Sequence, residues 1–247
     1  MGAGMRHLAW LGGVAALAAL LAVTAAAAQT QLQIPALRMP MVRSVRTALP
    51  AGPANCNPYS ARLANGEALN AQGNFDASLA IAAGILKTAP NDFQTNFFKG
   101  KTLYLKAAVT DKNRWNPPLP LSATMAEGFD TLIKTAAQLP QIDAACVAST
   151  NPYSILNTIG AFYLNRGYFS EAQTYLLQAY GNLAKMPLET KQKVCDNLGL
   201  VYLVQLQPDP SIRYYNEAKS YGSTVAPQQI VKANSLKSTL FALPTAK

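Results

Sequence analysis

The sequence predicts an all-α protein, a solenoid of helix-turn-helix repeats, and two recurring spacings support this fold class. The first spacing joins Gly66 to Gly100, which lie 34 residues apart. Between them stand Gly73-Asn74-Phe75 and then Pro90, in the order expected for a helix, a tight turn, a second helix and a helix breaker. Self-similarity at a period of about 20–50 residues is typical of repeat proteins.

The second spacing is 94 residues and relates two separate parts of the chain. Asn57-Pro58-Tyr59-Ser60 recurs as Asn151-Pro152-Tyr153-Ser154 at this offset. The same offset carries Gly66 to Gly160, Gly73 to Gly167 and Phe75 to Phe169. These matched landmarks predict that both parts adopt the same helix pair.

The first repeat is expected to contain helices at about residues 58–72 and 75–88. Gly73 favours the left-handed conformation that ends a helix, and Asn74 can cap the helix that follows. Apolar residues then recur at helical spacing from Leu79 to Leu86.

The second repeat is expected to be interrupted. Helices are predicted at about 93–109 and 122–139, with an insertion loop at about 110–121 whose three prolines exclude helix. Trp115 lies in this loop, between Lys112 and Arg114. Two interpretations stay open: an exposed Trp115 that contacts a partner, or a Trp115 that folds back onto the repeat core.

The third repeat is predicted from Leu156 to Ala179, and the fourth around Gly199 with Pro208 and Pro210 in its turn. A final helix at about 226–242 is expected to close the stack. Lys232 and Lys237 lie on its polar faces, as suits the capping element of an open helical array.

This arrangement resembles the tetratricopeptide repeat (TPR) family, in its exported bacterial type, over about residues 57–223. Arg62 and Ser78 depart from the family pattern, which often has Trp and prefers Ala at these positions. The resemblance implies about four repeats whose first helices line a concave groove that holds a peptide or a partner's helix. In this sequence the groove residues would be Glu67, Asn70, Phe97, Lys101, Tyr104, Asn157, Asn165, Lys193 and Asp196.

The N-terminus has the pattern of a signal peptide at residues 1–28, with a basic start, an apolar stretch and Ala25 to Ala28 before Gln29. A retained membrane anchor is the alternative, because the apolar stretch approaches the length of a span. Cleavage implies a periplasmic or secreted protein without a stable membrane span. The expected organisation is a signal peptide at 1–28, a Pro-rich flexible leader at 29–55, the repeat domain at 56–223, and a capping helix with its tail at 224–247.

Composition argues against an enzyme. The single histidine, His7, lies in the signal peptide, so His-dependent triads and His-ligated metals are excluded from the processed chain. No phosphate-binding or dinucleotide-binding glycine motif is present. We therefore expect no catalytic residues, no cofactor and no metal.

The chain is basic, with a net charge of +9, and its densest cationic stretch runs from Lys99 to Arg114. A basic balance favours anionic partners through long-range attraction. Nucleic acid is not expected as a partner, because an exported protein seldom meets it. A solvated helix face explains the same charges without any ligand.

Three cysteines in an oxidising compartment predict one disulfide and one spare thiol. The pair Cys146–Cys195 is our prediction, with Cys146 in the loop before the third repeat and Cys195 in the facing helix of the fourth. Cys56–Cys146 is the alternative, because both precede an Asn-Pro-Tyr-Ser motif. An inert, buried Cys195 is the remaining option.

Three functions follow as hypotheses. The first is an exported, non-enzymatic scaffold that binds a protein or peptide of the cell envelope. The second is an accessory subunit of a secreted or wall-modifying enzyme. The third is binding of an anionic glycan or lipid through the segment 99–114.

Overall fold

The computed structural model describes residues 56–110 and 121–242, and this part of the chain is all-helical and contains no strand. The expected signal peptide, the leader and the loop that carries Trp115 lie outside the described residues. The α-helices are α2 (Ser60–Ala71), α3 (Phe75–Leu86), α4 (Phe93–Thr110), α5 (Ala123–Ala136), α6 (Ala144–Thr150), α7 (Ser154–Asn165), α8 (Phe169–Tyr180), α9 (Leu188–Val204), α10 (Pro208–Ser220) and α11 (Ala226–Ala242). Two short 3-10 turns, η1 (Leu139–Gln141) and η2 (Leu183–Lys185), precede α6 and α9.

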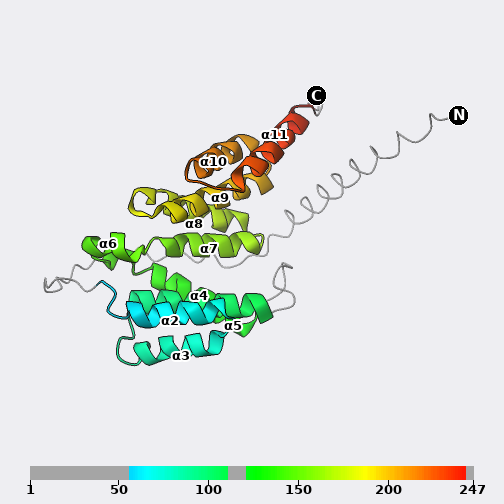
Figure 1. Cartoon of the computed structure of the whole chain (residues 1–247). Helices are drawn as coiled ribbons and strands as arrows, with labels where there is room; N and C mark the ends of the chain where they lie inside the picture. The colour runs from blue at the N-terminus through cyan, green and yellow to red at the C-terminus, as the bar shows by residue number, and fades with distance from the viewer. Residues whose placement is uncertain (1–55, 111–120, 243–247) are drawn as a thin grey trace. The chain divides into compact units, whose positions relative to one another are not determined.

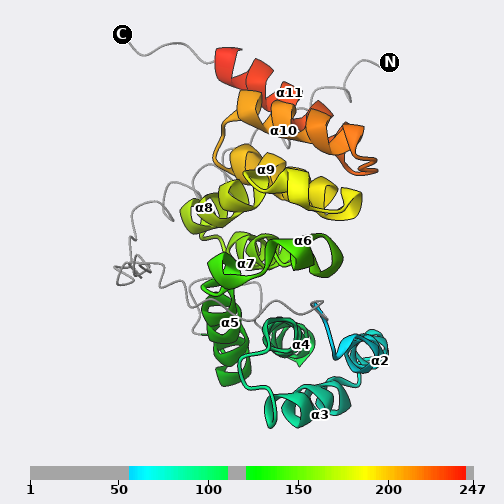
Figure 2. The ribbon, with the colours of Figure 1, turned by 90° about the vertical axis from the view of Figure 1, so that its left-hand side faces the viewer.

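Apart from α6, helices that are neighbours in sequence pack against one another in the described region. The helices of the pairs α2–α3, α4–α5, α7–α8 and α9–α10 contact each other, and each of the first three pairs contacts the next pair. Helix α11 packs on α10 (Figure 1). Figure 2 shows this order from α3 to α11. The described region is therefore a helical repeat-like fold.

The offset of 94 residues predicted from the sequence relates two helix pairs of equal length. The pair α2 and α3 and the pair α7 and α8 begin and end at residues that differ by 94, from Ser60 and Ser154 onwards. Both Asn-Pro-Tyr-Ser motifs make the same turn, in which the serine N–H donates to the carbonyl of Asn57 or Asn151 at 3.1 Å. The local sequence thus starts both helices in the same way.

The turn between the helices of a pair uses one left-handed residue. Gly73, Gly167 and Leu206 have φ angles of 75°, 78° and 59°. In each turn the next residue donates its N–H to a carbonyl five residues earlier, as from Asn74 to Leu69 at 2.9 Å. Glycine adopts this conformation without a steric penalty, whereas Leu206 does not.

Pro208 and Pro210 were expected in the turn of the fourth repeat, and this expectation is wrong, because α10 begins at Pro208 and Pro210 lies in its first turn. The first residue of a helix has no intrahelical partner for its N–H, so proline loses nothing there. Its fixed φ also suits the first helical turn.

Glycines allow the two helices of a pair to approach closely. A Cβ added to Gly160 would lie 2.5 Å from Leu176 Cγ, and one added to Gly199 would lie 2.8 Å from the ring of Tyr215. Two glycines also accept a hydrogen bond from the serine twelve residues later. Ser78 Oγ donates to Gly66 O at 3.1 Å, and Ser211 Oγ donates to Gly199 O at 2.8 Å. Ser78 is fully buried, so its hydroxyl satisfies a backbone group inside the core.

The core is one large cluster with smaller clusters around it. The large cluster joins α5, α7, α8, α9 and α10 through Leu132, Ile155, Ile159, Leu176, Val194, Leu198 and Tyr214. A smaller cluster of Leu63, Ala82, Ile85 and Phe98 holds α2, α3 and α4 together. Each buried side chain of this size contributes about 1.5–3 kcal/mol, so the repeated apolar positions account for the stacking.

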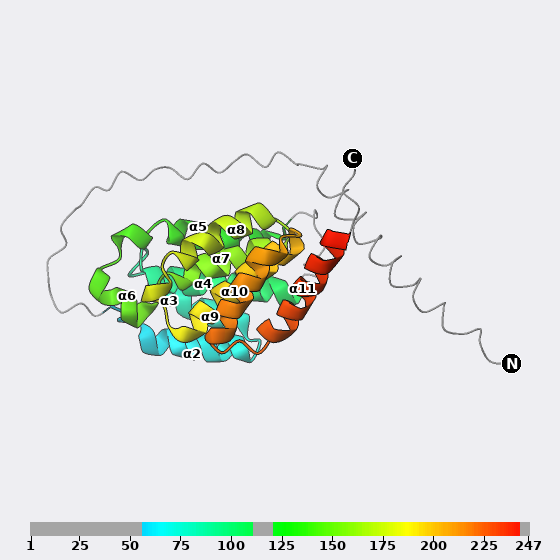
Figure 3. The same cartoon turned by 90° about the horizontal axis from the view of Figure 1, so that it is seen from above.

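Helix α6 was not expected from the sequence, which indicated a loop around Cys146. The helix begins where the carboxylate of Asp143 accepts the N–H of Ala145 at 2.9 Å. It ends at Thr150, and the next residue, Asn151, has a left-handed backbone conformation. Figure 3 shows α6 at the edge of the helical stack.

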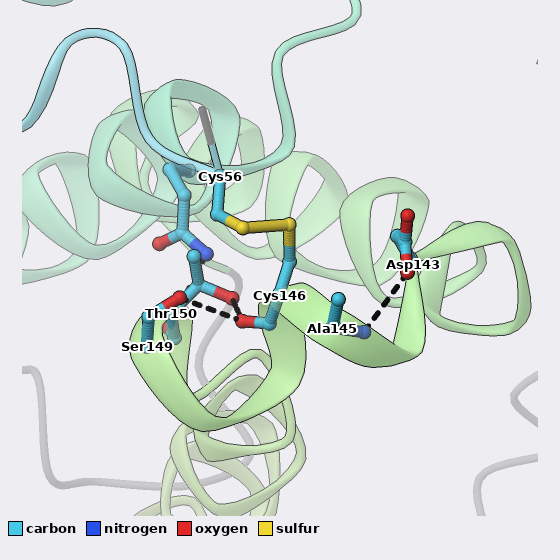
Figure 4. The surroundings of a disulfide bond; sticks show 7 residues. Cys56, Asp143, Ala145, Cys146, Ser149 and Thr150 are labelled. Carbon is cyan, nitrogen blue, oxygen red and sulfur yellow. Dashed lines mark hydrogen bonds between the residues drawn. A yellow bond between two sulfur atoms is a disulfide. The ribbon is translucent and has the colours of Figure 1, made fainter. Parts of the chain in front are cut away.

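The disulfide joins Cys56 to Cys146, so the predicted pair Cys146–Cys195 is wrong and the alternative pair is confirmed (Figure 4). The Cα atoms of Cys56 and Cys146 lie 5.2 Å apart, which suits a disulfide. Cys195 is fully buried and faces α10 and α11, where it packs on Tyr215, Ala218 and Ala226. Burial raises the pKa of the Cys195 thiol to about 12, which disfavours the reactive thiolate.

Replacement of Gly160 by alanine tests the close approach of α7 and α8. The new Cβ would overlap Leu176, and we expect a loss of about 1–3 kcal/mol in the free energy of unfolding, measured by urea denaturation. Gly84→Ala is the matched control, because its Cβ would meet only an Arg62 guanidinium nitrogen, at 3.1 Å. That helical substitution should stabilise the protein by about 0.5–1 kcal/mol, and destabilisation by both variants to the same extent would contradict the packing argument.

Replacement of Leu206 by glycine tests the left-handed turn of the fourth pair. We expect Leu206→Gly to raise the free energy of unfolding by about 0.5–1 kcal/mol, because glycine removes the penalty of a positive φ. Gly167→Ala, the reciprocal change at the equivalent turn, should lower it by a similar amount. A destabilising Leu206→Gly, measured in the same denaturation assay, would show that the exposed Leu206 side chain matters more than the backbone angle.

The disulfide should be a large source of stability, because it closes a loop across a sequence separation of 90 residues. The double variant Cys56→Ala with Cys146→Ala should lower the free energy of unfolding by about 2–5 kcal/mol. A reductant should destabilise the wild type by a similar amount and leave the double variant unchanged. Equal midpoints of the oxidised wild type and the double variant would contradict this expectation.

Candidate partner-binding surface

The predicted contact residues come from the first helix of each pair, α2, α4, α7 and α9. These helices are neighbours in the fold: α2 contacts α4, α7 contacts α9 and α9 contacts α11. Between α4 and α7, the rings of Tyr104 and Phe162 meet edge to face with their centroids 5.5 Å apart. We call the surface that α2, α4, α7 and α9 form the first-helix surface.

Glu67, Lys101 and Asn70 connect α2 to α4. Lys101 Nζ lies 2.6 Å from Glu67 Oε1 in an exposed ion pair. Asn70 is 8% exposed, and its amide donates to Thr102 Oγ1 at 2.8 Å. Asn70 therefore bridges two helices from a buried position, while Glu67 and Lys101 remain at the surface.

Tyr104, Asn165 and Asn157 make the next connections along the surface. The amide of Asn165 donates to Tyr104 Oη at 3.2 Å, from α7 to α4. The amide of Asn197 donates to Asn157 Oδ1 at 3.0 Å, from α9 to α7. Both contacts consist of neutral groups that can exchange their partner for a peptide backbone.

Lys193, Asp196 and Phe97 occupy different settings. Lys193 Nζ pairs with Glu189 Oε1 at 2.6 Å on the exposed side of α9. The carboxylate of Asp196 accepts the hydroxyl of Ser223 at 2.8 Å. Burial raises the pKa of Asp196, although the hydroxyl bond opposes this shift. Phe97 is half-buried and packs against the large core cluster.

The structure thus joins most of the predicted contact residues into bonds between successive first helices. These bonds run from α2 to α4, from α4 to α7 and from α7 to α9. Trp115 lies outside the described residues. The first-helix surface therefore offers a ligand amide, phenol and ion-pair groups that can exchange their partners. The exposed ion pairs among them add little stability of their own.

Stacked tyrosines form a feature that sequence reasoning missed. The rings of Tyr163 and Tyr175 stack with centroids 5.6 Å apart, and those of Tyr202 and Tyr214 stack at 5.4 Å. Burial is the largest cause that raises the pKa of Tyr163 to about 12. Both pairs are twelve residues apart, and one follows the other by 39 residues, as Gly199 follows Gly160. That spacing is the signal that could have identified them.

The cationic segment 99–114 is largely neutralised where the structure describes it. Lys99, Lys101 and Lys106 pair with Glu127, Glu67 and Asp76 at 2.8, 2.6 and 2.5 Å. Lys112 and Arg114 lie outside the described residues. Paired lysines give a weaker positive field than the sequence suggests.

Within residues 56–110 and 121–242, no group of three or more His, Cys, Asp or Glu could hold a metal ion. No helix in the same ranges is long and apolar enough to cross a membrane.

A scan of protein-family models finds no match to the chain, and a search of curated proteins finds none either.

Proposed function

We propose that the chain is an exported, non-enzymatic TPR-like scaffold that binds a protein or peptide partner in the cell envelope. In this proposal about four repeats and the capping helix α11 form a solenoid, and the first-helix surface holds the partner. The signal peptide pattern at residues 1–28 supports export.

The equivalence of three helix pairs supports a repeat architecture. The pair α7 and α8 relates to α2 and α3 by 94 residues, and Gly160 relates to Gly199 by 39. At the offset of 39 residues, the last residue of α7 corresponds to the last residue of α9, and the first residue of α8 corresponds to the first residue of α10. Helix α9 is longer than α7 because it begins earlier. Equivalent turns, glycines and serines then recur in the same roles.

The observation that carries the proposal is the run of polar bonds between successive first helices. In a solenoid each repeat contacts its neighbours, and equivalent helices form one continuous surface. Exposed or half-buried groups along it, such as Asn165, Tyr104 and Asn157, have hydrogen-bonding capacity that suits an extended peptide. Half-buried Tyr104 also offers an aromatic anchor, a type enriched at interfaces.

The ion pairs of Lys99, Lys101 and Lys106 count against the alternative in which segment 99–114 binds an anionic glycan or lipid. Each lysine would have to exchange a carboxylate partner for the ligand. The accessory-subunit alternative involves the same surface and differs only in the identity of the partner.

Crosslinking capture in the native host tests the proposal. The full-length chain, tagged at its C-terminus, is crosslinked in intact cells, and the copurifying proteins are identified by mass spectrometry. We expect one enriched envelope protein, crosslinked to Lys101 or Lys193, because these lysines lie on the first-helix surface.

Two arginine variants locate the contact. Asn165→Arg changes an exposed residue of α7 and should reduce recovery of the partner by at least about tenfold, as expected when a central interface residue is lost. Gln178→Arg changes an exposed residue of α8 and should have no effect. Equal recovery with both variants would exclude the first-helix surface, and recovery of no protein with the wild type would overturn the scaffold proposal.

A further inference from the structure

A pocket of about 680 Å³ lies beside α6, away from the residues assigned to the first-helix surface. Its lining residues come from the segment of η1 and α6, from η2 and the two residues before α9, and from Tyr153. We call it the α6 pocket. Its lining residues are Leu139, Pro140, Ile142, Ala144, Val147, Ala148, Tyr153, Ala184, Lys185, Met186 and Pro187.

Apart from Tyr153 and Lys185, the side chains that line the α6 pocket are apolar. The N–H of Ile142 donates to Leu139 O at 3.3 Å, and the N–H of Met186 donates to Leu183 O at 2.9 Å. Pro140 and Pro187 have no N–H at all. A bound peptide would place backbone polar groups against these apolar side chains, which offer them no hydrogen bond.

Lys185 and Tyr153 are the two strongly polar side chains of the lining, and they lie together. Lys185 Nζ lies 4.9 Å from the centroid of the Tyr153 ring and 3.4 Å from its hydroxyl. Lys185 is the one charged residue of the lining, and its other bond goes to the neutral amide of Asn182 at 3.3 Å.

The acidic residues near these walls in sequence have other partners. Asp143 caps α6 through the N–H of Ala145, and Glu189 pairs with Lys193 at 2.6 Å. The described contacts of Lys185 thus contain no carboxylate, and a negative charge of a ligand would complement it.

We propose that the α6 pocket binds a straight-chain fatty acid. The alkyl chain would lie on the apolar walls, and the carboxylate would accept hydrogen bonds from Lys185 Nζ and the Tyr153 hydroxyl. A fatty acid has one negative charge at the end of an alkyl chain, and the lining has one positive charge, Lys185, beside the Tyr153 hydroxyl and otherwise apolar side chains. This inference does not depend on the scaffold function.

The size of the pocket agrees with such a ligand, because small-molecule pockets usually measure about 300–1,000 Å³. The Cys56–Cys146 disulfide ties α6 to the start of the α2 region (Figure 4). The wall formed by Ala144, Val147 and Ala148 is therefore held in place without a ligand. A preformed pocket lowers the cost of ordering a binding site.

Calorimetric titration of the purified, disulfide-bonded full chain with octanoate, decanoate and dodecanoate tests the proposal. Each buried CH₂ should tighten binding about fourfold, so each step of two carbons should lower Kd about fifteenfold. The acids are kept below their micelle concentrations. The methyl ester of dodecanoic acid should bind more weakly, because it lacks the charge that pairs with Lys185.

Variants in the pocket and outside it complete the test. Lys185→Met should weaken dodecanoate binding about tenfold and leave the ester unaffected, as expected for one charge-assisted hydrogen bond. Ala148→Trp should abolish binding by filling the pocket. Both residues are exposed, so the unfolding midpoint should not change. The matched control is Lys219→Met, an exposed lysine of α10 outside the pocket, which should bind like the wild type.

Several results would overturn the proposal: no detectable binding, a Kd independent of chain length, or equal binding by the wild type, Lys185→Met and Ala148→Trp. A short peptide with an apolar end that binds more tightly than dodecanoate, and is lost in Ala148→Trp, would assign the pocket to a peptide instead. Capture of an envelope protein by the Ala148→Trp variant would show that the scaffold function is independent of this pocket.

Discussion

The close approach of helices at glycine is the constraint on which the described structure depends. Without a side chain at Gly66, Gly160 and Gly199, the neighbouring helix can lie against the backbone, and larger residues such as Leu176 and Tyr215 fill the space beside it. The short distance between the helices of a pair brings residues that are twelve positions apart in the sequence into contact. Serine hydroxyls meet glycine carbonyls, and tyrosine rings stack on tyrosine rings, in equivalent places.

The polar residues of the first helices show how such a fold combines stability with a binding surface. Asn70 is buried and bonded to Thr102, so its contribution is structural. The contact of Tyr104 with Asn165 and that of Asn157 with Asn197 are nearer to solvent, where a bond can be exchanged for one to a ligand at small cost. Residues with the same spacing in the sequence therefore have different roles according to depth.

The fold departs from regular repetition at α6, and the α6 pocket lies at that departure. The connection between α5 and α7 contains an additional turn, η1, and an additional helix, which the disulfide joins to Cys56. Regular stacking buries apolar faces against the next helix, whereas this inserted segment leaves apolar side chains around an open space. A ligand site in an insertion can change without disturbing the core of the stack.

The sequence by itself determined the all-helical class, most helix bounds and two glycine turns, because caps, breakers and apolar periodicity act within a few residues. It predicted α11 at its observed bounds of 226–242 and the shared start of α2 and α7. Tertiary structure decided what depends on the orientation of helix faces: Cys195 faces α10 and α11, so Cys146 pairs with Cys56 instead. It also decided the burial of Asn70, the ion pairs of the cationic segment and the walls of the α6 pocket, since each joins residues far apart in the chain.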